Sequence, residues 1–209
     1  MAFLWKSVIE TTDTILNAID KRKLTAVVLL DMSKTFDSVN HEMLILKLQD
    51  VGTSSHTLQW FHSYLSNRKQ VVRIHSTLSE PLPVSSAVPK GSILGPLLFS
   101  IYTNDLALIP QKCSTHSYVE GKKLITSFQL KDNLDAITDL KDDLFKIGEW
   151  CSNNLLLLNP GKTKLMIFGS RQMRAKLQFH SLPFMGKDII PTDTAKDLGM
   201  ILDSNKMNT

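Results

Sequence analysis

The chain has 209 residues, 43% of them hydrophobic, which is enough to bury one sizeable core or two small ones. Its 24 Lys and Arg residues against 20 Asp and Glu give a net charge of +4, which permits nucleic acid as a partner without requiring it. No stretch approaches the roughly 18 apolar residues of a membrane span, the first apolar run is too short for a signal peptide, and Cys113 and Cys151 lack the close spacing of zinc sites. The composition predicts a soluble, intracellular protein, cytoplasmic or nuclear, with reduced cysteines and no membrane partner.

The start of the chain predicts one buried strand between two helices. Apolar residues repeat on one helical face over residues 3–20 and predict an amphipathic helix. The run LTAVVLLDM at 24–32 is continuous and rich in valine, which is typical of a strand buried on both faces. It carries a carboxylate, Asp31, at its end. The stretch HEMLILKLQDVG predicts a helix that stops at Gly52.

The middle of the chain predicts a helix, a strand and a second, more apolar helix. Residues 58–65 carry apolar side chains at helical spacing, and QVVRIHS at 70–76 alternates like a strand. A proline-rich loop follows. Residues 91–108 then predict a largely apolar helix that is capped by Ser92, in which Pro96 lies early enough to be tolerated.

The last part of the chain predicts two hairpins, a long helix and a final strand. HSYVEGKKLI at 116–125 is typical of a tight hairpin, and residues 131–152 predict a long amphipathic helix. LLLLNPGKTKLMIFG at 155–169 predicts strand, turn and strand, and AKDLGMILD at 195–203 predicts one more strand. Helices and strands in this order indicate a single α+β domain with helices packed on a small sheet.

Asp31 has two interpretations from its position alone. A carboxylate at the end of a strand often caps the following turn. It is also the kind of ligand that a hard cation such as Mg²⁺ prefers, since such cations bind oxygen atoms held on rigid backbone.

Five sequence blocks favour the second interpretation, and their order and spacing over residues 10–205 resemble the reverse-transcriptase domain of non-LTR (LINE-type) retrotransposons. The blocks are LDMSKTFDSVNHEML, VPKGSILGPLLFSIYTNDL, the Ser-Tyr hairpin, NPGKTKLMIFG and KDLGMILDS. The resemblance implies the palm of a right-handed polymerase with part of the fingers, a palm core at about 24–205, and a small antiparallel sheet with helices packed on one side. It also implies DNA synthesis from a DNA primer on an RNA template, with two Mg²⁺ ions.

The resemblance assigns roles to residues of the first two blocks. Asp31 matches the first catalytic aspartate and metal ligand, and the carbonyl of Met32 would add a ligand beside the nucleotide. Phe36 matches the bulky side chain under the incoming sugar. Lys90 and Gly91 match the loop that contacts the nucleotide and the template, although the family has glutamine where Lys90 stands.

Two further positions, Ala87 and Lys162, correspond to family positions with an expected residue or role. Ala87 stands where glycine is usual. Lys162 matches a lysine that acts as a general acid towards pyrophosphate; Lys164 is close by, and both can equally be solvated turn lysines. GKT within this block is not a phosphate loop, because that loop needs glycine where this chain has Leu156.

The hairpin departs most from the family, whose residues there are Tyr-Ala-Asp-Asp. Here they are Tyr118, Val119, Glu120 and Gly121, followed by two lysines. Glu120 keeps one vestigial metal-binding carboxylate, and Gly121 has lost the other. Because paired Mg²⁺ ions are held together by bridging carboxylates, the substitution predicts that Mg²⁺ is not bound productively and that this copy is catalytically inactive. One of the two lysines, or water, is expected to pair with Asp31.

Two other interpretations use the same scaffold: a domesticated module that binds nucleic acid or protein, and a non-functional relic. Weak, non-specific nucleic-acid binding is expected. Arg68, Lys69 and Arg73 beside Trp60 and Tyr64 suit such a module, although runs of this kind are often only a solvated helix end. The resemblance further places the upstream fingers strands, the thumb and the endonuclease outside these 209 residues.

Overall fold

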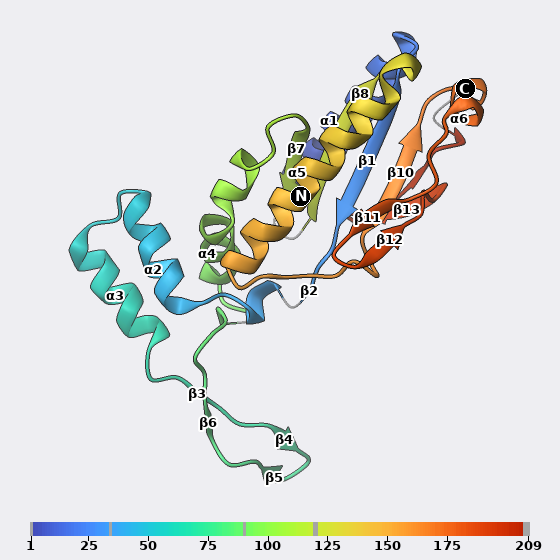
Figure 1. Cartoon of the computed structure of the whole chain (residues 1–209). Coiled ribbons are helices and arrows are strands. Elements are labelled where there is room, and N and C mark those ends of the chain that lie inside the picture. Colours follow the sequence, from blue (N-terminus) through green and yellow to red (C-terminus); the bar gives the residue numbers. More distant parts are fainter. Residues whose placement is uncertain (1, 34, 90, 119–120, 207–209) are drawn as a thin grey trace. The chain divides into compact units, whose positions relative to one another are not determined.

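The computed structural model describes residues 2–33, 35–89, 91–118 and 121–206, and the chain divides into two compact units (Figure 1). The first unit consists of residues 1–33, 106–152 and 158–209, and the second of residues 34–105 and 153–157. Within the described ranges, no helix has both the length and the apolar character that a membrane crossing requires.

The first unit is built on a four-stranded antiparallel sheet in the order β10-β1-β8-β7. The strands are β1 (Leu24–Leu30), β7 (Ser114–Tyr118), β8 (Gly121–Phe128) and β10 (Lys164–Phe168). Val27 of β1 lies opposite Ile125 of β8 and Met166 of β10. The predicted buried strand is therefore confirmed as the inner strand β1, and the predicted hairpin is confirmed as β7 and β8.

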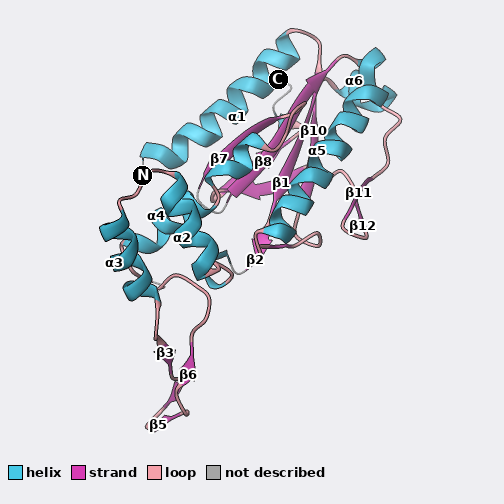
Figure 2. Ribbon diagram, turned by 60° about the vertical axis from the view of Figure 1, so that its left-hand side comes forward, coloured by secondary structure: helices cyan, strands magenta, loops and turns pink. Residues whose placement is uncertain are grey.

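Two helices, α1 (Ala2–Asp20) and α5 (Asn133–Asn153), cover opposite faces of this sheet (Figure 2). The side chains of two adjacent residues of β8 extend towards different helices. Lys123 donates to Thr11 of α1, whereas Lys122 lies beside Cys151 of α5. The expectation that the helices pack on one side is wrong, because side chains alternate along a strand and β1 is apolar at both parities.

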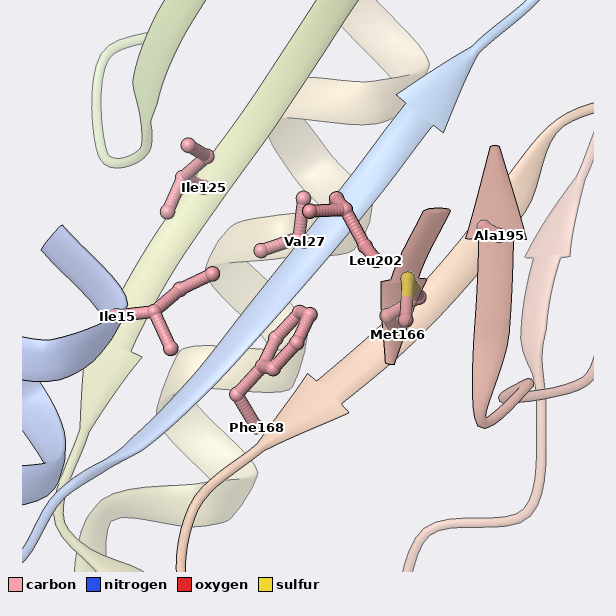
Figure 3. Close-up of a cluster of buried hydrophobic side chains, with 7 residues drawn as sticks. All are labelled: Ile15, Val27, Ile125, Met166, Phe168, Ala195 and Leu202. Carbon is pink, nitrogen blue, oxygen red and sulfur yellow. The ribbon is translucent and has the colours of Figure 1, made fainter. Parts of the chain in front are cut away.

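A cluster of buried side chains joins α1, the sheet and the C-terminal hairpin on one face (Figure 3). Its members are Ile15, Val27, Ile125, Met166, Phe168, Ala195 and Leu202. Burying side chains of this kind stabilises a fold by about 1.5–3 kcal/mol each. Because Val27, Leu29 and Asp31 share one parity of the chain, Asp31 follows the same face beyond the apolar core.

The C-terminal segment forms hairpins where a single strand was predicted. Residues 195–203 divide into β13 (Thr194–Asp197) and β14 (Met200–Asp203), which pair antiparallel. Leu198 and Gly199 both have positive φ, 47° and 89°, and make the two-residue turn between them. The remaining elements of this part are α6 (Arg171–Lys176), β11 (Leu182–Phe184) and β12 (Lys187–Ile189), and in the preceding region η2 (Asn104–Leu108), η3 (Leu130–Asp132) and β9 (Leu157–Leu158).

The described part of the second unit contains three α-helices, a short 3-10 helix and a two-stranded arm. Its elements are η1 (Thr35–Asp37), α2 (His41–Asp50), α3 (Ser55–Leu65), α4 (Leu94–Tyr102), and the pairs β3 (Lys69–Gln70) with β6 (Leu82–Pro83) and β4 (Arg73–Ile74) with β5 (Thr77–Leu78). The predicted helices at α2 and α3 are confirmed, whereas the one predicted over 91–108 begins at Leu94 and ends at Tyr102. Ser92 lies one residue before the N-cap position, Ile93, and its Oγ accepts from the N–H of Gly95 at 3.0 Å. The strand predicted at 70–76 is instead two short strands of the exposed arm (Figure 1).

Ala87 adopts a backbone conformation that favours glycine. Its φ is 87°, and its N–H and C=O are held by Val39 O and His41 Nε2, each at 2.8 Å. Ala87→Gly is therefore expected to raise the free energy of unfolding by about 0.5–1 kcal/mol, since relieved strain exceeds the added entropy of the unfolded glycine. Urea denaturation measures this. The control Ala136→Gly, within α5, is expected to lower stability by about 1 kcal/mol. Loss of stability in both variants would contradict the prediction.

Candidate active site

Asp31 follows β1 and is anchored through its backbone. Its carbonyl accepts from the N–H of Asn159 at 2.9 Å, and its N–H donates to Thr163 Oγ1 at 3.5 Å. Its side-chain Oδ2 is buried and has no hydrogen-bond partner among the described residues. The strand end therefore presents one carboxylate oxygen that no described donor satisfies.

The turn 159–163 and the start of the following strand bring two lysines to the same hollow as this carboxylate. Asn159 organises the turn: its carbonyl accepts from the N–H of Lys162 at 3.1 Å and from that of Thr163 at 2.9 Å, and its Oδ1 accepts from the N–H of Gly161 at 3.0 Å. β10 starts directly afterwards at Lys164, opposite Leu29 of β1. The docking of the turn on Asp31 thus places Lys162 and Lys164 at one end of the sheet.

These groups line two hollows in the first unit, of about 230 and 550 Å³. Both hollows are lined by Asp31, Lys162, Lys164 and Lys196. The smaller one is also lined by Gly121, Lys122 and Asp197. We call the two together the basic hollow. Among the described residues, none of Lys162, Lys164 and Lys196 forms an ion pair, so their charges face the hollow without a carboxylate partner within 4 Å.

Lys123, one of the two hairpin lysines, is buried in an ion pair. Its ammonium lies 2.5 Å from Asp197 Oδ2, and the two side chains are only 1% and 6% exposed. The ammonium also donates to Thr11 Oγ1 at 3.3 Å and to the carbonyl of Ser7 at 3.5 Å. Lys123 therefore pairs with β13 and contacts α1, so it is not the hairpin lysine available to Asp31.

Lys122, the other hairpin lysine, extends towards the opposite face of the sheet. It is largely buried beside Cys151 of α5. Burial lowers the pKa of Lys122 to about 8, against a smaller raising effect of Cys151. Burial likewise raises the pKa of the Cys151 thiol to about 12, so this thiol is protonated and inert near neutral pH.

The described residues do not fit a two-metal centre. Asp31 contributes one carboxylate, Gly121 has no side chain, and Asp197 is neutralised by Lys123. No group of three or more His, Cys, Asp or Glu side chains placed for a metal ion occurs within the parts of the chain that the structure describes. Paired Mg²⁺ ions need bridging carboxylates, whereas the charged residues common to both parts of this hollow are three lysines and Asp31. One orphaned oxygen on Asp31 suits at most a single cation.

Similarity to a known protein family identifies the fold that carries this site. The family described as reverse transcriptase (RNA-dependent DNA polymerase) matches residues 4–202. The chain belongs to the reverse-transcriptase family. Among solved structures, apo telomerase from Candida tropicalis, truncated from its C-terminal domain, covers 95% of this chain and 40% of its own, with a TM-score of 0.55 and 14% identity. That likeness concerns the fold alone.

Three curated relatives of this reverse-transcriptase domain are from Drosophila mobile elements. The probable RNA-directed DNA polymerase from transposon BS of Drosophila melanogaster is 32% identical over 73% of the chain and 17% of its own length. That from the X-element of the same species is 28% identical over 91% and 21%, and that from the jockey element of Drosophila funebris is 27% identical over 90% and 20%. The chain thus spans about a fifth of the length of these relatives.

The other residues predicted for the reverse-transcriptase site have different placements. Met32 is buried in the first unit. Phe36 and Gly91 belong to the second unit; the Phe36 ring packs on Phe99 of α4 at 5.4 Å between centroids, and Gly91 has a φ of 76°. Lys90 and Glu120 lie outside the described residues. The structure therefore brings together Asp31, Gly121 and Lys162, and describes Phe36 and Gly91 separately.

Lys196 and Asp197 were not predicted as site residues. Both lie on β13, where exposed Lys196 alternates with buried Ala195 and Asp197. In the sequence, AKDLG gives Asp197 the inward parity of Ala195, and an inward carboxylate on an apolar strand is a signal for a buried partner. That signal identifies a need for a cation but not which lysine supplies it.

Proposed function

We propose that this chain is the palm region of a non-LTR retrotransposon reverse transcriptase that has lost polymerase activity. The observation that carries the proposal is the basic hollow: lysines surround Asp31 where the family reaction needs bridging carboxylates. A positive hollow repels the cations that would neutralise the primer hydroxyl and the leaving pyrophosphate. We assign the palm core to residues 24–205, and all of it up to residue 202 lies within the matched span 4–202.

Primer extension tests this proposal. Purified protein with an RNA template and a DNA primer is expected to show no extension above an Asp31→Ala control, with Mg²⁺ or with the more tolerant Mn²⁺. Loss of one catalytic metal removes several kcal/mol of transition-state stabilisation, which corresponds to a rate more than about a thousandfold slower. Extension that depends on Asp31 would contradict the proposal.

Thermal unfolding with Mg²⁺ provides a second readout of the same prediction, independent of activity. A ligand that binds only the native state adds about 2.7 kcal/mol at a hundred times its dissociation constant. Millimolar Mg²⁺ is expected to leave the melting temperature unchanged in both the natural chain and Asp31→Asn. A rise that Asp31→Asn abolishes would show that a working metal site remains.

A second candidate function is metal-independent binding of nucleic acid. It is favoured by Lys162, Lys164 and Lys196, which converge on the hollow from a turn, β10 and β13 and form no ion pair within the described residues. Phosphate contacts made by such lysines give sequence-independent affinity through counterion release.

The expected affinity is weak, of the order of tens of micromolar or weaker near physiological salt. Replacing Lys162, Lys164 and Lys196 with alanine together is expected to weaken binding and to reduce the steepness of the salt dependence by about 2. The charge-matched control replaces the exposed lysines Lys21, Lys131 and Lys141, which do not line the hollow. Fluorescence anisotropy at several salt concentrations measures both. Equal losses in the two triple variants would assign the binding to net charge and not to the hollow.

A further inference from the structure

Three planar groups follow one another along the side of α3 in the second unit. The rings of Trp60 and Tyr64 are stacked, with centroids 5.3 Å apart and planes 7° apart. The guanidinium of Arg68 lies 5.8 Å from the centroid of the Tyr64 ring. Residues four apart, such as Trp60 and Tyr64, share one side of a helix, and Arg68 lies three residues beyond the end of α3 at Leu65. We call these residues the aromatic stack.

The stack does not serve as the buried face of the helix. Leu65 occupies that face and is fully buried, whereas Trp60 is 52% exposed. The Trp60 indole is nevertheless held in place, by Tyr64 and by the neighbouring Phe61 ring, whose centroid is 5.0 Å away at 79°. An indole that is oriented by two ring contacts and half open to solvent presents a rigid, apolar plane at low entropic cost.

The charge of the chain segment that carries this plane is almost entirely positive. Residues 51–104 contain one acidic residue, Glu80, against Arg68, Lys69, Arg73 and Lys90. Lys69 and Arg73 lie on exposed strands of the arm that follows α3. Among the described residues, Arg68, Lys69 and Arg73 form no ion pair with a carboxylate. A partner that combines flat apolar groups with negative charge complements this segment.

We propose that the aromatic stack binds single-stranded nucleic acid by stacking a base on Trp60, while Arg68 and Lys69 contact the phosphates that flank it. Surfaces for single strands combine these two parts, an aromatic plane for the base and cations along the backbone. The inference rests on the second function proposed above and deepens it. It adds a contact with the base itself, whereas the basic hollow offers only charge for the phosphates. It is independent of the loss of polymerase activity.

The test uses the full chain and two strands of equal length, one of thymidine nucleotides and one of abasic sugar-phosphate units. The thymidine strand is expected to quench tryptophan fluorescence and to bind about tenfold more tightly than the abasic strand, within the range of single base–aromatic stacks. Trp60→Leu is expected to abolish both the quenching and the difference, and Trp60→Phe to retain part of the difference. Because Trp60 is half exposed, these variants should keep the melting temperature of the natural chain.

Two control variants show whether a difference in affinity between the strands comes from Trp60 or from charge. Val51→Ala removes a comparably exposed apolar side chain of the same unit and is expected to change nothing. The triple alanine variant of Lys162, Lys164 and Lys196 is expected to weaken both strands equally. Equal affinity for the two strands, or an unchanged difference in Trp60→Leu, would overturn the inference and leave charge-driven binding intact. Absence of binding to either strand would overturn the nucleic-acid function and the inference together.

Discussion

Replacing Lys123 with alanine is expected to lower the free energy of unfolding by about 3–5 kcal/mol, because it leaves a buried carboxylate without its counter-ion. Asp197 is 6% exposed and its ion pair with Lys123 spans 2.5 Å. Asp197→Ala is expected to cost a similar amount, since among the described residues it leaves the ammonium of Lys123 with the neutral acceptors Thr11 Oγ1 and Ser7 O. Denaturant unfolding, with the slope checked for constancy, measures both.

The double variant Lys123→Met with Asp197→Leu tests whether charge burial causes the loss. Ala195 and Leu202 of the same hairpin already belong to the apolar cluster, so the site can accept apolar side chains. Replacing both charges is expected to restore stability to within about 1 kcal/mol of the natural chain, because well-packed apolar groups commonly match a buried ion pair. Losses that simply add in the double variant would refute this account.

An exposed ion pair is the matched control. The ammonium of Lys112 lies 3.8 Å from Asp139 Oδ1, and both side chains are well exposed. Lys112→Ala is expected to cost less than about 1 kcal/mol, since solvent screens such pairs. The contrast between the two lysines isolates the effect of burial.

Asp143→Asn is expected to destabilise the chain by about 2–4 kcal/mol, since charged hydrogen bonds and buried donors are both costly to lose. Asp143 lies on α5 and is fully buried. Its carboxylate accepts from the N–H groups of Gln111, Lys112 and Cys113 at 3.0, 2.8 and 2.8 Å, which fixes the loop that enters β7. The control Asp142→Asn, at an exposed neighbouring position, is expected to change stability by less than about 0.5 kcal/mol.

The cost of Asp143→Asn should depend on pH in a defined direction. Burial raises the pKa of Asp143. The three N–H groups and Lys146 together lower this pKa by more than burial raises it, so the net pKa lies below the usual range. A group with a lowered folded pKa stabilises the fold above its unfolded pKa of about 4, and this contribution is lost as pH falls through the folded value. The stability gap between the natural chain and Asp143→Asn is therefore expected to be full at pH 7 and to narrow in acid. A gap that widens in acid would contradict this assignment.

The sequence alone was sufficient for the local elements and for the family. The apolar run at 24–30 identified the inner strand, helical periodicity identified α1, α2, α3 and α5, and turn residues identified the hairpin of β7 and β8. The order of five blocks indicated a reverse transcriptase, and residues 4–202 match that family. These features repeat over a few residues or follow fixed spacings along the chain, so neighbouring positions contain the information that determines them.

The tertiary structure alone decided which charges meet. Lys123 and Asp197 are 74 residues apart in the sequence, and no local sequence pattern pairs them. Their contact depends on β13 packing on the face of the sheet that α1 also covers. The low dielectric there makes an unpaired charge costly enough to select that pairing. The convergence of Lys162, Lys164 and Lys196 on Asp31 likewise requires the turn 159–163 and β13 to meet at one end of the sheet. Periodicity assigns a side chain to a face, but only the packed chain determines which partner it meets there.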